Sequence, residues 1–135
     1  MSTVKVSGLS SYKEPEPLMK AWYTCVITEA RAVNEGRFAV NYMVTDGPTQ
    51  PDGEDPAGRK FSDFFTTSGY ENHKDKGKFA TAQLARFLAA CGVDVSEDEF
   101  ELEELADKKI SVFVKAKPDL DGFMRENGVR YAAVD

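Results

Sequence analysis

Residues 22–48 read WYTCVITEARAVNEGRFAVNYMVTDGP, and this stretch decides the fold. Its first part, WYTCVITEA, is rich in β-branched and aromatic residues that alternate with a period of two, a pattern typical of a strand. Asn34-Glu35-Gly36 interrupts the run, and FAVNYMV then alternates again until Asp46-Gly47-Pro48 ends it. The pattern predicts two strands that pair as a hairpin.

The remaining elements follow from changes in composition and period. Glycines and prolines mark residues 46–58 as a loop, and a polar run predicts a second loop over residues 68–78. Apolar residues then recur at helical spacing, with Gly92 where a left-handed C-terminal cap is expected. The expected elements are strands at residues 22–30, 38–44, 59–67, 110–116 and 129–134, a helix at 79–91, and a turn-rich connection at 118–127.

The predicted order of elements is β-β-β-α-β-β. Five short strands with one amphipathic helix between strands three and four are typical of the OB-fold, a mainly β, five-stranded Greek-key barrel that binds oligonucleotides or oligosaccharides. A five-stranded α+β sheet of another topology is the alternative.

The chain of 135 residues is long enough for one core. We expect a lead-in segment over residues 1–20, which carries two prolines, and one OB-fold-like domain over residues 21–135. No apolar run reaches the roughly 20 residues that cross a bilayer, and the first residues do not resemble a secretion signal. The expectation is a protein of the cytoplasm, that of the host cell if the chain is encoded by a phage, without a membrane partner.

The charge of the chain is unevenly distributed. The formal net charge is −6, which argues against a polyanionic ligand. However, residues 94–107 contain eight acids and no base, which leaves 15 acids against 17 bases in the rest of the chain. A basic groove outside this acidic segment is therefore compatible with the composition, and the acidic segment itself is expected to be a solvated surface.

No catalytic constellation is apparent in the sequence. It contains no nucleophile elbow, phosphate-binding glycine loop or dinucleotide fingerprint. The single histidine, His73, has no partner for general-base chemistry, and Cys25 and Cys91 lie in apolar patterns that indicate buried thiols. We therefore expect a protein that is not an enzyme and that binds no metal or cofactor. A small hydrolase is the least favoured of the functions considered.

The layout of several segments resembles the small single-stranded-DNA-binding proteins, and related uncharacterised families, that bacteriophages encode. The segments are 22–30, 38–47, 58–64, 84–92 and 107–110, and the resemblance spans roughly residues 20–134. It implies an OB-fold that coats single-stranded DNA in phage replication or recombination, and partners among phage or host replication and recombination proteins.

A binding site for single strands combines aromatic rings, on which bases stack, with positive charge for the phosphates. Outward-facing strand residues, aromatics out of phase with the core and bases in loops meet this requirement. Whether one or the other set of strand-three phenylalanines is exposed stays open at this stage. The candidate nucleic-acid-binding residues are Trp22, Arg37, Asn41, Arg59, Lys60, Phe61, Phe64, Tyr70, Lys74, Lys76, Lys78, Phe113, Arg125 and Arg130.

The rival hypothesis is a protein-interaction module, in which the same fold presents its acidic segment to a phage or host protein. The negative net charge favours this rival. The sequence leaves open whether copies of the chain assemble with one another.

Overall fold

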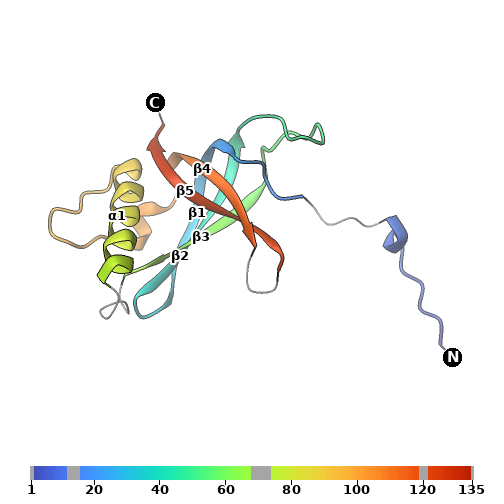
Figure 1. Cartoon of the computed structure of the whole chain (residues 1–135), viewed down its shortest axis with the longest axis horizontal. Coiled ribbons are helices and arrows are strands. Elements are labelled where there is room, and N and C mark those ends of the chain that lie inside the picture. Colours follow the sequence, from blue (N-terminus) through green and yellow to red (C-terminus); the bar gives the residue numbers. More distant parts are fainter. Residues whose placement is uncertain (1, 12–15, 68–73, 119–121, 135) are drawn as a thin grey trace.

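A computed structural model describes residues 2–11, 16–67, 74–118 and 122–134, with residues 74–78 described as backbone only (Figure 1). The strands are β1 (Ala21–Asn34), β2 (Arg37–Asp46), β3 (Lys60–Thr66), β4 (Lys109–Pro118) and β5 (Met124–Ala133). One α-helix, α1 (Lys74–Cys91), lies between β3 and β4, and short 3-10 turns span Leu9–Ser11 and Leu102–Leu105. The chain is thus mainly β with the predicted order of elements.

The five strands form one antiparallel sheet in the order β3-β2-β1-β4-β5. β1 is long and pairs with β4 through Ala21–Val26 and with β2 through Thr24–Asn34, with register irregularities at three places. Irregularities of this kind bend a strand and increase its twist. β3 pairs antiparallel with β2, and β5 pairs antiparallel with β4, so both run parallel to β1. β3 and β5 form the two edges of the sheet.

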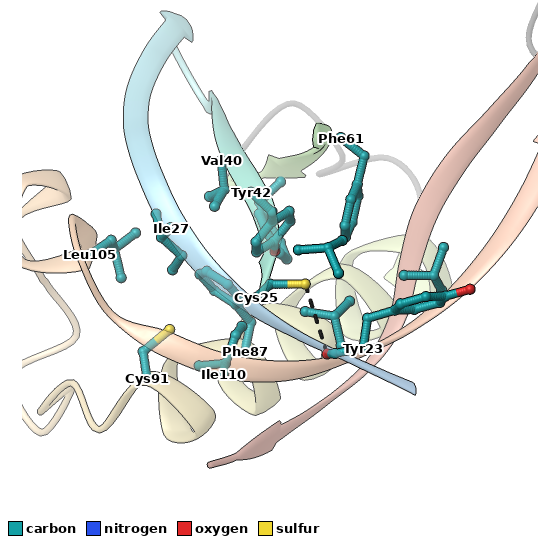
Figure 2. Close-up of a cluster of buried hydrophobic side chains, with 14 of the residues drawn as sticks. Tyr23, Cys25, Ile27, Val40, Tyr42, Phe61, Phe87, Cys91, Leu105 and Ile110 are labelled. Atoms are coloured by element: carbon teal, nitrogen blue, oxygen red, sulfur yellow. Dashed lines mark hydrogen bonds between the residues drawn. The ribbon is translucent and has the colours of Figure 1, made fainter. Parts of the chain in front are cut away.

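The alternation predicted for the first hairpin is confirmed. Tyr23, Cys25 and Ile27 are buried on β1, as are Phe38, Val40, Tyr42 and Val44 on β2. These side chains meet those of β3, β4 and α1 in one cluster (Figure 2). Cys25 and Cys91 are both free thiols in this cluster, and burial raises the pKa of Cys25 to about 12 and that of Cys91 to about 11.

Three predicted boundaries are wrong by four or more residues. β1 ends at Asn34 rather than Ala30, because its last residues continue to pair with β2. The helix begins at Lys74 rather than Phe79. Its first turn is polar and so lacks the apolar spacing by which the helix was predicted. β5 begins at Met124, within the expected connection, because Met124–Asn127 continues the backbone ladder opposite Lys115–Pro118. This end of the hairpin lies beyond the core, so no apolar alternation marks it in the sequence.

α1 packs mainly against β5 and covers one end of the sheet (Figure 1). Phe87 is fully buried, and the centroid of its ring lies 4.6 Å from that of Phe65 and 5.2 Å from that of Tyr131. The helix ends as predicted at Gly92, whose φ is +74°, and Val93 N–H donates to the Leu88 carbonyl across the cap. No helix in the described ranges is long and apolar enough to cross a membrane.

The end of the expected lead-in segment is part of the folded core. Leu18 is only 2% exposed, and its N–H donates to Glu126 Oε1. Gln50 Oε1 accepts the Met19 N–H at 2.9 Å, and Tyr23 Oη donates to the Met19 carbonyl at 2.7 Å. Residues 2–11, by contrast, are exposed throughout.

Candidate nucleic-acid interface

A groove of about 470 Å³ lies where the two edges of the sheet, the first half of α1 and the β4–β5 hairpin meet. Its described basic side chains come from three strands: Arg37 is the first residue of β2, Lys117 is the next to last of β4, and Arg125 is the second of β5. Its exposed aromatic rings are Phe64 of β3, at 39%, and Phe79 of α1, at 68%. A groove with basic side chains and accessible aromatic rings has the chemistry that binding of a single-stranded nucleic acid requires.

Phe64 and Arg37 contact each other within this groove. The guanidinium carbon of Arg37 lies 4.6 Å from the centroid of the Phe64 ring, a cation–π geometry. Alternation on β3 puts Phe61, Asp63 and Phe65 in the core and leaves Phe64 on the outer face. The question that the sequence left open is therefore answered: Phe64 is the exposed phenylalanine of strand three.

Among the described residues that line the groove, Asp63 is the only acid, and its carboxylate is directed inward. Oδ1 accepts the Gly128 N–H at 2.8 Å, and Oδ2 accepts from Tyr42 Oη at 3.0 Å and Tyr131 Oη at 2.8 Å. Burial raises the pKa of Asp63, while these three hydrogen bonds oppose the rise. The Asp63 carboxylate is buried and accepts three hydrogen bonds, so the accessible charged side chains among the described lining residues are Arg37, Lys117 and Arg125.

A smaller hollow of about 280 Å³ continues from the groove along the outer side of β3. It shares Phe64 and Arg125 with the groove and is also lined by Phe61, Ser62 and Glu126. Glu126 accepts from Arg59 Nη2 at 3.2 Å and from the Leu18 N–H at 3.1 Å, so its carboxylate is already engaged within the protein. Phe64 thus stands between two adjoining hollows.

A second group of predicted residues lies on the outer face of the sheet. The rings of Trp22 and Phe113 are 5.5 Å apart, and these residues are direct partners on β1 and β4. Lys20 Nζ and the Arg130 guanidinium carbon each lie 5.9 Å from the Phe113 ring centroid. We call Lys20, Trp22, Phe113 and Arg130 the outer patch.

The other predicted residues have different surroundings. Phe61 is 7% exposed and packs on Tyr42 with ring centroids 4.8 Å apart, so we do not include it in the interface. Arg59 is paired with Glu126 and donates to the Glu16 carbonyl, which fixes the N-terminal segment.

Asn41 is held by hydrogen bonds with Glu29 and Ser62, and Lys60 is exposed at the start of β3. Tyr70 lies outside the described residues. The remaining predicted residues, Lys74, Lys76 and Lys78, lie in the first turn and a half of α1, just before Phe79.

Of the described residues that line the groove, the sequence predicted only Arg37, Phe64 and Arg125, and two of those missed, Phe79 and Lys117, have the chemistry for a nucleic acid. Phe79 was assigned only to the helix, although it is out of phase with the helix face that packs on the core through Leu84, Phe87 and Leu88. Lys117 is in phase with Phe113 at a period of two, so alternation alone could have placed both on the outer face.

No protein-family model and no curated protein matches the chain. Within the described residues, no group of three or more His, Cys, Asp or Glu side chains could hold a metal ion.

Proposed function

We propose that this protein binds single-stranded DNA, without catalysis, in the groove between the edges of its sheet. The observation that supports this most directly is the Arg37–Phe64 pair, in a groove where the other accessible charged side chains that the structure describes, Lys117 and Arg125, are basic. Bases would stack on Phe64 and Phe79, and Arg37, Lys117 and Arg125 would neutralise phosphates. The resemblance to phage proteins favours a role in phage DNA replication or recombination.

The proposal includes an OB-fold-like barrel that is open between β3 and β5. Three features support it: the strand order, the position of α1 between β3 and β4, and the link that Asp63 makes from β3 to Gly128 on β5. In such a fold the ligand lies on strands two and three, between the loops that join strands one to two and four to five. The location of the groove supports this part of the proposal, because Arg37 follows the β1–β2 turn and Lys117 and Arg125 flank the β4–β5 turn.

The test is a fluorescence-anisotropy titration of a labelled oligothymidylate and of a labelled duplex. We expect the wild type to bind the single strand and not the duplex at low salt. Phe64→Leu should weaken binding about 5- to 100-fold, because stacking contributes roughly 1–3 kcal/mol per base. Arg37→Glu should weaken it as well, and Lys108→Glu is the charge-matched control beside the acidic segment. Failure of the wild type to bind either nucleic acid would overturn the proposal.

A second candidate function is recognition of a basic protein segment by the acidic side of the molecule. A hollow of about 220 Å³ between α1 and residues 95–100 is lined by Leu84, Leu88, Val95 and Phe100. It adjoins a second hollow lined by five acids, Asp94, Glu97, Glu99, Glu101 and Glu104. An apolar hollow beside acids suits a segment with both basic and apolar side chains.

A labelled Lys/Leu peptide tests this second candidate. Binding that is lost in a Glu97→Lys, Glu99→Lys, Glu101→Lys variant and retained in Arg37→Glu would support it. Equal binding by both variants would contradict it.

A further inference from the structure

The outer face of the β4–β5 hairpin carries a row of basic residues. Direct pairing places Lys117 opposite Arg125, Lys115 opposite Asn127, and Phe113 opposite Arg130. Paired residues of antiparallel strands project to the same side, and alternate positions share a face. These three successive pairs therefore form one continuous strip, whose inner-face neighbours on β4, Val112 and Val114, are buried.

The six residues of the strip include four basic side chains and no acidic one. The acid nearest to it in sequence, Glu126, is paired with Ala116 on the other face and bonds to Arg59. In a chain with a net charge of −6, such a segregated row marks a surface that favours an anionic ligand. Phosphates spaced along a nucleic-acid strand match a linear row of cations.

The strip joins the groove to the outer patch. At one end, Lys117, Arg125 and Asn127 belong to the strip and also line the groove. At the other end, Phe113 contacts Trp22, which is 43% exposed, and Arg130 lies over Phe113. Lys117 and Phe113 are four residues apart, or about 13 Å along the strand.

We propose that a single strand longer than the groove leaves it at Lys117 and Arg125, follows the outer face of the β4–β5 hairpin and stacks a base on Trp22. The inference rests on the proposed function and extends it: the groove holds a short segment, and the strip with the outer patch holds the next. The binding site is then bipartite, with an aromatic platform at each end and basic residues between them.

The two segments can be separated by oligonucleotide length. Oligothymidylates of about 6 and about 20 nucleotides lie near and beyond the two ends of the range that one OB-fold covers. Trp22 is the single tryptophan of the chain, so its fluorescence reports directly on stacking in the outer patch. We expect the long strand to quench this fluorescence and to bind more tightly, and the short strand to bind with little quenching.

A Lys115→Glu, Arg130→Glu variant tests the strip, since both residues lie outside the groove lining. It should lower affinity for the long strand at least tenfold and leave affinity for the short strand within about twofold. A Lys5→Glu, Lys108→Glu variant, which changes the net charge by the same amount, is the control. Because Phe64→Leu should weaken both lengths, the two variants have distinct signatures.

The outcomes distinguish the two proposals. If the wild type binds both lengths with equal affinity and unchanged tryptophan fluorescence, the bipartite site is wrong while the groove proposal stands. Equal weakening of both lengths by the strip variant would also overturn the bipartite site. If the wild type binds neither length, the proposed function fails, and the bipartite site with it.

Discussion

Asp63 on β3 accepts a hydrogen bond of 2.8 Å from the backbone N–H of Gly128 on β5, and so links the two edges of the sheet. A side chain at position 128 would overlap Asp63 Oδ2 and bring its Cβ to 2.9 Å from Val112 Cγ1. The close approach of the two edges therefore requires glycine at this position. The same pair forms part of the groove, so the fold and the candidate site share this contact.

Asp63→Ala should lower the free energy of unfolding by about 2–4 kcal/mol. It removes the acceptor of the Gly128 N–H and of Tyr42 Oη, and a buried donor without a partner costs about 1–3 kcal/mol. Tyr131 Oη keeps the Gly128 carbonyl as an acceptor at 3.2 Å. Asp63→Asn retains an acceptor for the backbone N–H and should cost less. Urea unfolding monitored by circular dichroism measures both, and equal stability of Asp63→Ala and the wild type would contradict the assigned role.

The raised pKa of Asp63 predicts how stability depends on pH. The folded protein holds the Asp63 proton at pH values where the unfolded chain has lost it, so stability falls as pH rises from about 4 through the folded pKa. Above the folded pKa this contribution is constant. Asp63→Asn cannot titrate and should lack it.

The measurement is the difference in unfolding free energy between the wild type and Asp63→Asn across pH 4–8. That difference should shift in favour of the wild type as pH falls. A shift in the opposite direction would mean that hydrogen bonding outweighs burial and that the folded pKa is lowered.

The alternation of residues 38–44 and the helical spacing of residues 79–91 were sufficient to predict the main elements. Both signals come from side chains that face a single core, so they are readable locally. On strand three the same alternation separates Phe61 from Phe64 but does not say which faces the core, so both were candidates; the structure buries Phe61 and exposes Phe64.

The groove could not be assembled from local patterns. It combines Arg37, Phe64, Phe79 and Lys117, which lie on four elements that meet only in the folded sheet. Asp63 is a charge on the buried face of β3, and its partners Gly128 and Tyr131 are more than 60 residues away. Nothing near Asp63 in the sequence indicates that they will satisfy it.

Gln50→Ala should release the segment that precedes β1. The buried Gln50 side chain accepts from the Met19 N–H and donates to Tyr23 Oη and to the Pro48 carbonyl. Its loss leaves these groups with fewer partners, at a cost of about 1–3 kcal/mol. Limited trypsin cleavage after the exposed Lys20 should then be faster than in the wild type. Gln83→Ala, which removes an amide that contacts β5, is the control, and an unchanged cleavage rate in Gln50→Ala would contradict the role of Gln50 as an anchor.

The salt dependence of binding counts the phosphates that the groove neutralises. The described lining of the groove has three basic side chains, those of Arg37, Lys117 and Arg125. Each phosphate of a single strand that is neutralised contributes about 0.7 to the magnitude of the slope of log affinity against log salt concentration. A short oligothymidylate should therefore give a slope of magnitude about 2, reduced by about 0.7 in Lys117→Gln and unchanged in Lys108→Gln. Anisotropy titrations at four or more salt concentrations measure these slopes. A slope near zero would mean that the bases of the groove do not contact phosphates, and an equal decrease in both variants would show only a general effect of net charge.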